Sequence, residues 1–369
     1  TGENLLDPGD TPNENLQFLL VLACIMRGVD RYAGLLRCSA ACAGNEHRLG
    51  AQEAPPAIIS IFLGDQLDNV VEQIVSNTQS IQLLASGTLD SGVSTVPVLD
   101  KDATDRNRTS PFAFTGNKFE FRMVGSSDSI AEANVALNAI VAQSLCEAAD
   151  ILEQAQDFPA ACSQLIHNWM TQHQRIIFNG DGYSSEWVQE AKRRGLPNFV
   201  SMVDAVPSLV AQETVELFSK FNIYTRSELE ARAEILYETY VKVVKIEANT
   251  MLHMAAKHFI PTAITYSTRL SQSMAAVSAA CPEADVSVQR KLLTQVSALL
   301  ADAAAALEQL RPLMDRVDAI DGIKEMAQAY HEAIIPAMDA LRHPVDELEL
   351  MVDKDIWPVP TYGDLMFEV

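Results

Sequence analysis

The sequence is poor in basic residues and in cysteine. Lysine and arginine together number 27, against 49 aspartates and glutamates, which gives a formal net charge of −22. A phosphate backbone or an anionic bilayer would repel such a chain, so general binding to nucleic acid or to a membrane surface is excluded. The six cysteines form no CxxC pair and are too sparse for a disulfide scaffold, which indicates reduced thiols in a cytoplasmic compartment.

Long hydrophobic runs, a signal peptide, an initial methionine and internal repeats are also missing. The run LQFLLVLACIM, which begins at Leu16, is too short to cross a bilayer and continues into charged residues, so we expect a buried helix. The chain opens at Thr1 in turn-rich sequence, as a fragment cut from something longer would. With 369 residues, of which 48% are hydrophobic, the chain can bury a large core in two or more structural units.

The patterns that are present predict an α+β part followed by a helical part. After about residue 158, β-type runs almost vanish and amphipathic helices follow one another, so we place the domains at 1–157 and 158–369. Strands are expected over 57–63 and 118–122. Two helices are expected to begin at capping boxes, one running from the box at 11–14 to residue 37 and one from the box at 225–228 to residue 258. Further helices are expected from Ser126 or Ser127 onward and over 286–317.

A local cluster of cations stands out against the acidic background. Arg106, Arg108, Lys118 and Arg122 surround a single carboxylate, Glu120. In a strand, the three charges of KFEFR share one face and its two phenylalanines share the other. The conservative interpretation is a half-buried strand whose polar side meets water. Alternatively, the guanidinium groups bind phosphate or carboxylate, and the glutamate either pairs with them or ligates a divalent metal that accompanies a nucleotide.

Two other motifs are weak candidates for chemistry. His253 and His258 are five residues apart, a spacing that does not place two ligands on one α-helical face, so each is interpreted as a packing or surface residue. The segment Asn179-Gly180-Asp181-Gly182 lacks the later ligands of a calcium loop and is interpreted as a tight turn.

Several segments resemble one enzyme family. The order HRLGAQEAPPAI (47–58), then DRNRTSPFAFTGNKFEFR (105–122), then an apolar helix resembles the C-terminal half of the glutamine synthetase catalytic domain. FNGDGYSSEWVQEAKRRGLPN (178–198) and the closing Trp-Pro segment are similar to the long type III bacterial forms. The resemblance covers nearly the whole chain. It implies antiparallel strands plus helices over 1–157 and a long-helix bundle over 158–369.

The resemblance also implies an activity and a set of site residues. Such enzymes ligate ammonia to the side-chain carboxylate of L-glutamate through γ-glutamyl phosphate, with ATP as co-substrate and Mg²⁺ or Mn²⁺ as the metal. Glutamate, ATP and ammonium are the implied partners, within a cytoplasmic homo-oligomer, a ring dodecamer. Matching the family motifs position by position implies a role for each residue. Arg48 and Arg122 hold glutamate, and Glu53 lies on a mobile flap and helps deprotonate ammonium. Arg108 reaches the phosphoryl group and binds nucleotide phosphate together with Arg106 and Lys118, while Glu120 ligates the metal.

The sequence departs from the family pattern in two places. The loop from Arg48 to Glu53 is one residue shorter than in the common forms, and Ala113 stands nearest to a position where they carry an arginine, so Lys118 or Arg106 must supply that ATP contact. The other metal ligands are expected outside this chain, so we expect the fragment alone to be inactive. Two alternatives stay open: a γ-glutamyl-amine ligase that uses another amine, and a non-catalytic helical assembly module.

Overall fold

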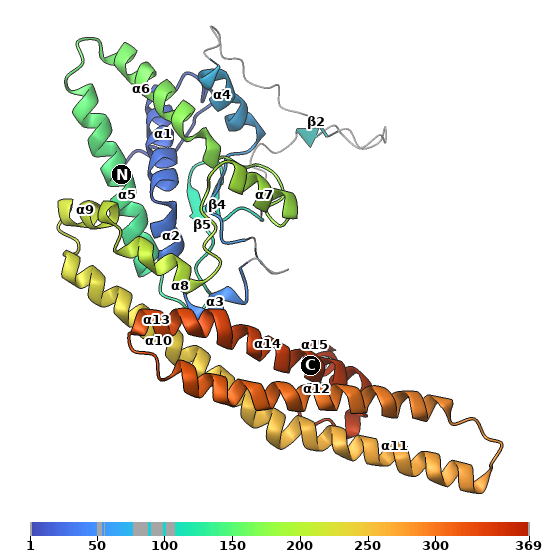
Figure 1. The fold of residues 1–369 in the computed structure, drawn as a ribbon. Helices are drawn as coiled ribbons and strands as arrows, with labels where there is room; N and C mark the ends of the chain where they lie inside the picture. The colour runs from blue at the N-terminus through green and yellow to red at the C-terminus, as the bar shows by residue number, and fades with distance from the viewer. Residues whose placement is uncertain are drawn as a thin grey trace. The chain divides into compact units, whose positions relative to one another are not determined.

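The computed structural model of the chain describes residues 2–49, 54, 56–76, 88–89, 99–100 and 108–367. Helices dominate the described residues and accompany a small mixed sheet, which confirms the expected α+β class (Figure 1). The chain divides into two compact units, residues 1–233 and 234–369, and each is described by itself.

The sheet of the first unit has the order β1-β4-β5, formed by β1 (Ile61–Phe62), β4 (Phe112–Phe114) and β5 (Phe119–Phe121). β1 runs parallel to β4, whereas β4 and β5 form an antiparallel hairpin. Gly116 lies in the hairpin loop with a φ of 91°, a conformation that glycine adopts without strain. Both predicted strands are therefore confirmed, although each is shorter than the predicted range. A separate two-stranded ribbon pairs β2 (Thr88–Leu89) with β3 (Leu99–Asp100).

The core of this unit is built around α1 (Leu16–Arg31), which confirms the predicted buried helix. α1 packs against α5 (Ala131–Leu152) and α6 (Phe158–His173). α5 is long and apolar enough to cross a bilayer by length and composition alone. One side of α5, which includes Ala136 and Ile140, is buried in the same core, as in a core helix.

The helices after residue 158 do not all belong to the second unit. Ile61 of β1 forms a parallel bridge with Ile177, and Ile58 forms an antiparallel bridge with Asn198, so this region packs with the sheet. The domain boundary expected after residue 157 stays a prediction. The remaining helices of the first unit are α2 (Ala33–Ser39), α3 (Ala43–Glu46), α4 (Asp65–Val75), α7 (Ser185–Arg193), α8 (Met202–Ala205) and α9 (Gln212–Lys220), with 3₁₀ turns at Gln174–Ile176 and Val206–Leu209.

The second unit consists of helices in its described residues. α12 packs against both α11 and α14, and the side chains between them include Ala263, Val296 and Leu348. The elements in chain order are α10 (Arg226–Met254), which begins in the first unit, a π-helix (Ala255–Phe259), α11 (Ile260–Ala280), α12 (Ser287–Val317), α13 (Ile323–Ala329), a second π-helix (Tyr330–Ile334), α14 (Ile335–Met351), a 3₁₀ turn (Lys354–Ile356) and α15 (Tyr362–Phe367).

Each π-helix ends just before a proline, Pro261 or Pro336. Proline lacks an N–H, and its ring would clash with the carbonyl four residues back, so the helix widens locally. The wider turn brings His253 and His258 side by side, with ring centroids 5.7 Å apart. The expectation that a five-residue spacing separates these rings is therefore wrong here, although both residues are on the surface as predicted.

Two helices begin at other residues than the sequence predicts. α1 begins at Leu16 because the Asn15 side chain, and not the box at 11–14, accepts a hydrogen bond from the N–H of Phe18. α5 begins at Ala131, whose N–H donates to Ser129 Oγ at 3.2 Å. The capping box at Thr225 is confirmed, since the N–H of Thr225 donates to Glu228 Oε2 at 2.7 Å and α10 follows.

Candidate functional site

The charged face of β5 is formed as the alternation of residues predicts. Glu120 Oε2 accepts hydrogen bonds from Arg122 Nη2 at 2.8 Å and Nε at 3.2 Å, and Lys118 Nζ lies 3.7 Å from Glu120 Oε1. Ala113 pairs with Glu120 across the hairpin, so the side chain at position 113 shares this face. One carboxylate thus lies between two cations on a partly exposed surface.

The opposite face of the hairpin fixes this strand to the core. Phe119 stacks on Phe112 with ring centroids 4.8 Å apart and also contacts Phe114 at 5.2 Å. Phe114 in turn lies 6.0 Å from Phe18 of α1. Because the aromatic side is packed, the backbone that carries the three charges is held in place.

Arg108 lies at the same end of the hairpin as Arg122. It is exposed, and it precedes Pro111 by three residues; the carbonyl of Pro111 accepts a hydrogen bond from the N–H of Arg122 at 2.8 Å. Lys118 lies at the other end, where the carbonyl of Lys118 accepts a hydrogen bond from the N–H of Thr115 at 2.9 Å. Arg108 and Arg122 therefore lie at one end of the hairpin, and Lys118 lies at the other end.

A loop distant in sequence anchors the residue after Arg108. The N–H of Gly182 donates to Thr109 Oγ1 at 2.8 Å, and a Cβ at position 182 would lie 2.5 Å from the carbonyl oxygen of Thr109. The same loop is fixed to the end of β1, because Asn179 Oδ1 accepts hydrogen bonds from the N–H groups of Leu63 and Gly64.

The tight turn that the sequence predicts at Asn179–Gly182 is found two residues later, at Asp181–Ser184, where the N–H of Ser184 donates to the carbonyl of Asp181 at 3.3 Å. The loop also positions the segment around Thr109. The sequence patterns did not predict this second role. Turn residues alone do not show which surface a turn contacts. The match of residues 178–198 to one enzyme family was the feature that could have indicated a role for this loop beyond a turn.

Arg48 reaches the same end of the hairpin through a buried asparagine. Arg48 Nη1 donates to Asn45 Oδ1 at 3.4 Å, and Asn45 Nδ2 donates to the carbonyls of Ala40 and Met123, both at 2.8 Å. Met123 directly follows Arg122, so Asn45 connects the segments that carry Arg48 and Arg122, the two predicted glutamate-binding arginines. No sequence pattern pointed to Asn45. The predicted site residues Glu53 and Arg106 lie outside the described residues.

Metal-ligating side chains do not cluster among the described residues. Within ranges 2–49, 54, 56–76 and 108–367, no three His, Cys, Asp or Glu side chains come together in a group that could hold an ion. Glu120 fits as a single ligand, because a carboxylate is the hard oxygen donor that Mg²⁺ and Mn²⁺ prefer. A complete coordination shell needs further donors.

The cysteines do not add a nucleophile to this region. All six are free thiols, as predicted. Cys42 is the nearest in sequence to the Arg48 segment, and its Sγ donates to Asp128 Oδ2 at 3.0 Å. Burial and this hydrogen bond raise the pKa of the Cys42 thiol to about 11, and burial raises the pKa of Cys24 and Cys38 to about 12. These thiols are protonated at neutral pH, whereas the thiolate is the reactive form.

Comparisons with known proteins agree on one family. The family model described as Glutamine synthetase C-terminal domain matches residues 161–278. The chain is 41% identical over 377 residues to a protein named Type-3 glutamine synthetase from Dictyostelium discoideum, a match that covers 99% of this chain and 51% of that relative. Proteins named Glutamine synthetase from Bacteroides fragilis (strain YCH46) and Butyrivibrio fibrisolvens are each 35% identical over 100% of the chain, covering 52% and 53% of their own lengths. The chain thus spans about half the length of the curated relatives it matches.

Proposed function

Because the chain belongs to the type-3 glutamine synthetase family, we propose that it forms part of an enzyme that makes glutamine from glutamate, ammonia and ATP. The observation that carries the proposal is the face of β5, where Glu120 lies between Lys118 and Arg122 on a strand fixed by its aromatic side. Of the residues that the family resemblance assigns to the site, Lys118, Glu120 and Arg122 lie on this hairpin, and Arg48 and Arg108 lie on segments next to it.

The proposed reaction has two steps. A carboxylate oxygen of glutamate attacks the γ-phosphorus of ATP and ADP leaves; ammonia then attacks the carbonyl carbon and phosphate leaves. Negative charge on the transferring phosphoryl group must be met by cations that are already in position. Arg108 is exposed at the end of the hairpin and suits this role. A divalent metal, with Glu120 as one ligand, would neutralise charge on the ATP phosphates.

The amino-acid substrate is assigned to the Arg48 and Arg122 end of the hairpin. Guanidinium groups bind carboxylates through paired hydrogen bonds, and Asn45 holds the two arginine-bearing segments together. Glu53 is proposed as the residue that helps to deprotonate ammonium. Arg106 is proposed to contact nucleotide phosphate.

Lys118 is proposed to replace the arginine that the common forms carry near position 113. A side chain at 113 shares the face of Glu120, so an arginine there would lie beside the metal ligand. Ala113 leaves that place without a cation of its own. The Lys118 side chain is 65% exposed on the same face and can extend toward a phosphate.

We propose that the working form is a larger homo-oligomer, a ring dodecamer in the cytoplasm, and that this chain alone is inactive. Two observations support inactivity: the relatives are about twice as long, and the described residues contain no group of three His, Cys, Asp or Glu side chains that could hold a metal ion. The remaining ligands would come from sequence beyond this chain.

The test is the substrate dependence of phosphate release by the full polypeptide that carries this chain. Phosphate should appear only when ATP, glutamate and ammonium are all present. Equal turnover with ethylamine in place of ammonium would indicate a γ-glutamyl-amine ligase. Absence of turnover with any amine, in an intact oligomer, would indicate a non-catalytic assembly module.

A further inference from the structure

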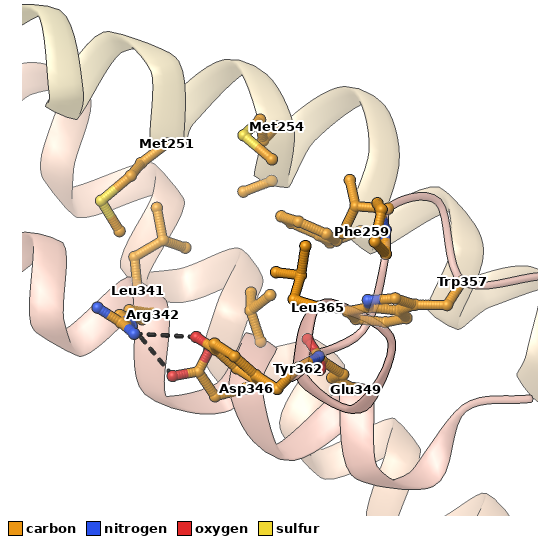
Figure 2. A pocket seen from close by; sticks show the side chains of 14 residues that line it. Met251, Met254, Phe259, Leu341, Arg342, Asp346, Glu349, Trp357, Tyr362 and Leu365 are labelled. Carbon is orange, nitrogen blue, oxygen red and sulfur yellow. Dashed lines mark hydrogen bonds and ion pairs between the residues drawn. The ribbon is translucent and has the colours of Figure 1, made fainter. Parts of the chain in front are cut away.

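A pocket of about 340 Å³ opens in the second unit between α10, α14 and the C-terminal segment (Figure 2). Its apolar lining includes Met251, Met254 and Leu341. Phe259 of the first π-helix and Trp357 form an aromatic wall, stacked with ring centroids 5.2 Å apart. Small-molecule sites typically measure roughly 300–1,000 Å³ and combine an apolar lining with a few polar groups, so this pocket is at the small end of that class.

Trp357 gives the pocket a hydrogen-bond donor that has no acceptor among the described residues. The residue is only 7% exposed, and an unpaired buried N–H destabilises a fold unless something pairs with it. Figure 2 shows the nitrogen edge of the indole turned toward the side of the pocket where Leu365 lies. Leu365 is 71% exposed, so few contacts hold its side chain, and it can turn away to admit an acceptor.

The polar rim of the pocket disfavours anions. Arg342 is already paired, since its Nε donates to Asp346 Oδ2 at 3.1 Å and its Nη2 donates to Tyr362 Oη at 2.9 Å. Glu349 adds a second carboxylate and accepts a hydrogen bond from the N–H of Tyr362 at 2.9 Å. These lining residues carry one positive and two negative charges in a strongly acidic chain, so a negatively charged ligand would be repelled.

We propose that this pocket binds a small, uncharged aromatic molecule that has a single ring or two fused rings and carries a hydrogen-bond acceptor. The rings lie against the methionine side chains and the Phe259 and Trp357 wall, where sulfur and aromatic groups make favourable contacts. The acceptor takes the N–H of Trp357. The lining belongs to the second unit, whereas the β5 hairpin belongs to the first, and the ligand is not a substrate of the proposed reaction.

Two molecules of the same shape test the proposed hydrogen bond. Quinoline carries a ring nitrogen that accepts a hydrogen bond, whereas naphthalene does not. Equilibrium dialysis against the full polypeptide would give the dissociation constant of each. Trp357→Phe keeps an aromatic ring and removes the donor, so it should weaken quinoline binding by about fivefold and leave naphthalene binding within about twofold.

Matched controls separate this site from general hydrophobic binding. Trp169→Phe, which changes a buried tryptophan of the first unit, should leave both constants unchanged. Met254→Trp fills the pocket and should abolish binding of both probes, with circular dichroism used to check that the variant is folded. The proposal is overturned if the wild-type protein fails to bind quinoline, if Met254→Trp still binds it, or if Trp357→Phe weakens both probes equally.

Discussion

At the scale of single residues, Glu120 has the most specific proposed role. Its carboxylate lies between Arg122 and Lys118, and an oxygen ligand of this kind is what a nucleotide-bound divalent metal requires. The pairing also explains how a carboxylate is held in place on a surface strand before any metal binds. The proposed role of Glu120 therefore depends on the negative charge of its carboxylate as well as on the shape of the side chain.

Glu120→Gln keeps the size of the side chain and removes its charge. We expect turnover to fall by roughly 100-fold or more and the metal concentration for half-maximal rate to rise, because preorganised charge is lost at the phosphates. Phosphate release at a series of Mg²⁺ concentrations measures both effects. Glu132→Gln, which alters an exposed carboxylate paired with Arg232, is the control and should leave both values unchanged. Normal kinetics in Glu120→Gln would remove this residue from the metal site.

Gly182 is predicted to act through Thr109 and not by contact with substrate. Gly182→Ala would place a Cβ 2.5 Å from the carbonyl oxygen of Thr109 and displace the segment that carries Arg108. A shift of about 1 Å can lower a rate by roughly 100-fold, so we expect a large fall in kcat with a smaller change in KM for ammonium.

The control for Gly182→Ala is Gly44→Ala. A Cβ at Gly44 meets nothing within 4 Å, so the same change of residue type should leave kcat unchanged. Thermal unfolding of both variants checks that the fold is intact. If Gly182→Ala retains full kcat, the contact with Thr109 has no part in positioning Arg108.

At the scale of secondary-structure elements, an ion network joins α1 to α5. Glu147 accepts hydrogen bonds from Arg27 at 2.7 Å and from Arg31 at 3.0 Å. Burial alone would raise the pKa of Glu147, but the hydrogen bonds from Arg27 and Gln143 outweigh it and hold the pKa below its ordinary value. The two helices are therefore coupled by charge as well as by apolar packing.

This network predicts a pH dependence of stability. A carboxyl whose folded pKa is lowered contributes stability above its unfolded pKa of about 4.5, and this contribution is lost as the pH falls through the lower folded value. Glu147→Gln should lower the free energy of unfolding of the first unit by about 1 kcal/mol at pH 7, a small value because the carboxylate is partly exposed to solvent. The difference in unfolding free energy between wild type and variant should shrink below about pH 4. Hydrogen exchange of α1 amides at both pH values measures this; a deficit independent of pH would contradict it.

Whether an element could be predicted from the sequence depended on the interactions that determine where it begins and ends. The alternation in KFEFR predicted β5 and its charged face, because a strand with one packed side repeats every two residues. The box at 11–14 misplaced the start of α1, since several polar residues compete for the cap and Asn15 holds the bond to Phe18. The π-helices were missed because sequence periodicity assumes a uniform α-helix, whereas Pro261 changes the local turn.

At the scale of the whole molecule, family motifs predicted more than local patterns did. Residues 105–122 and 178–198 indicated an enzyme family, and the relatives confirmed it over the whole chain. The amphipathic pattern after residue 158 predicted helices correctly, but an apolar helical face does not show which surface it will cover. The bridges of Ile177 to Ile61 and of Asn198 to Ile58 were therefore not predictable.

We expect the full polypeptide that carries this chain to activate glutamate by transferring phosphate to its side-chain carboxylate. Glutamate labelled with ¹⁸O in that carboxylate tests this directly, in the presence of ATP and ammonium. Each inorganic phosphate released should carry one ¹⁸O atom, because the carboxylate oxygen that attacks the phosphorus leaves with the phosphate. Phosphate released without the label would contradict the account, since ATP would then have been hydrolysed without activation of glutamate.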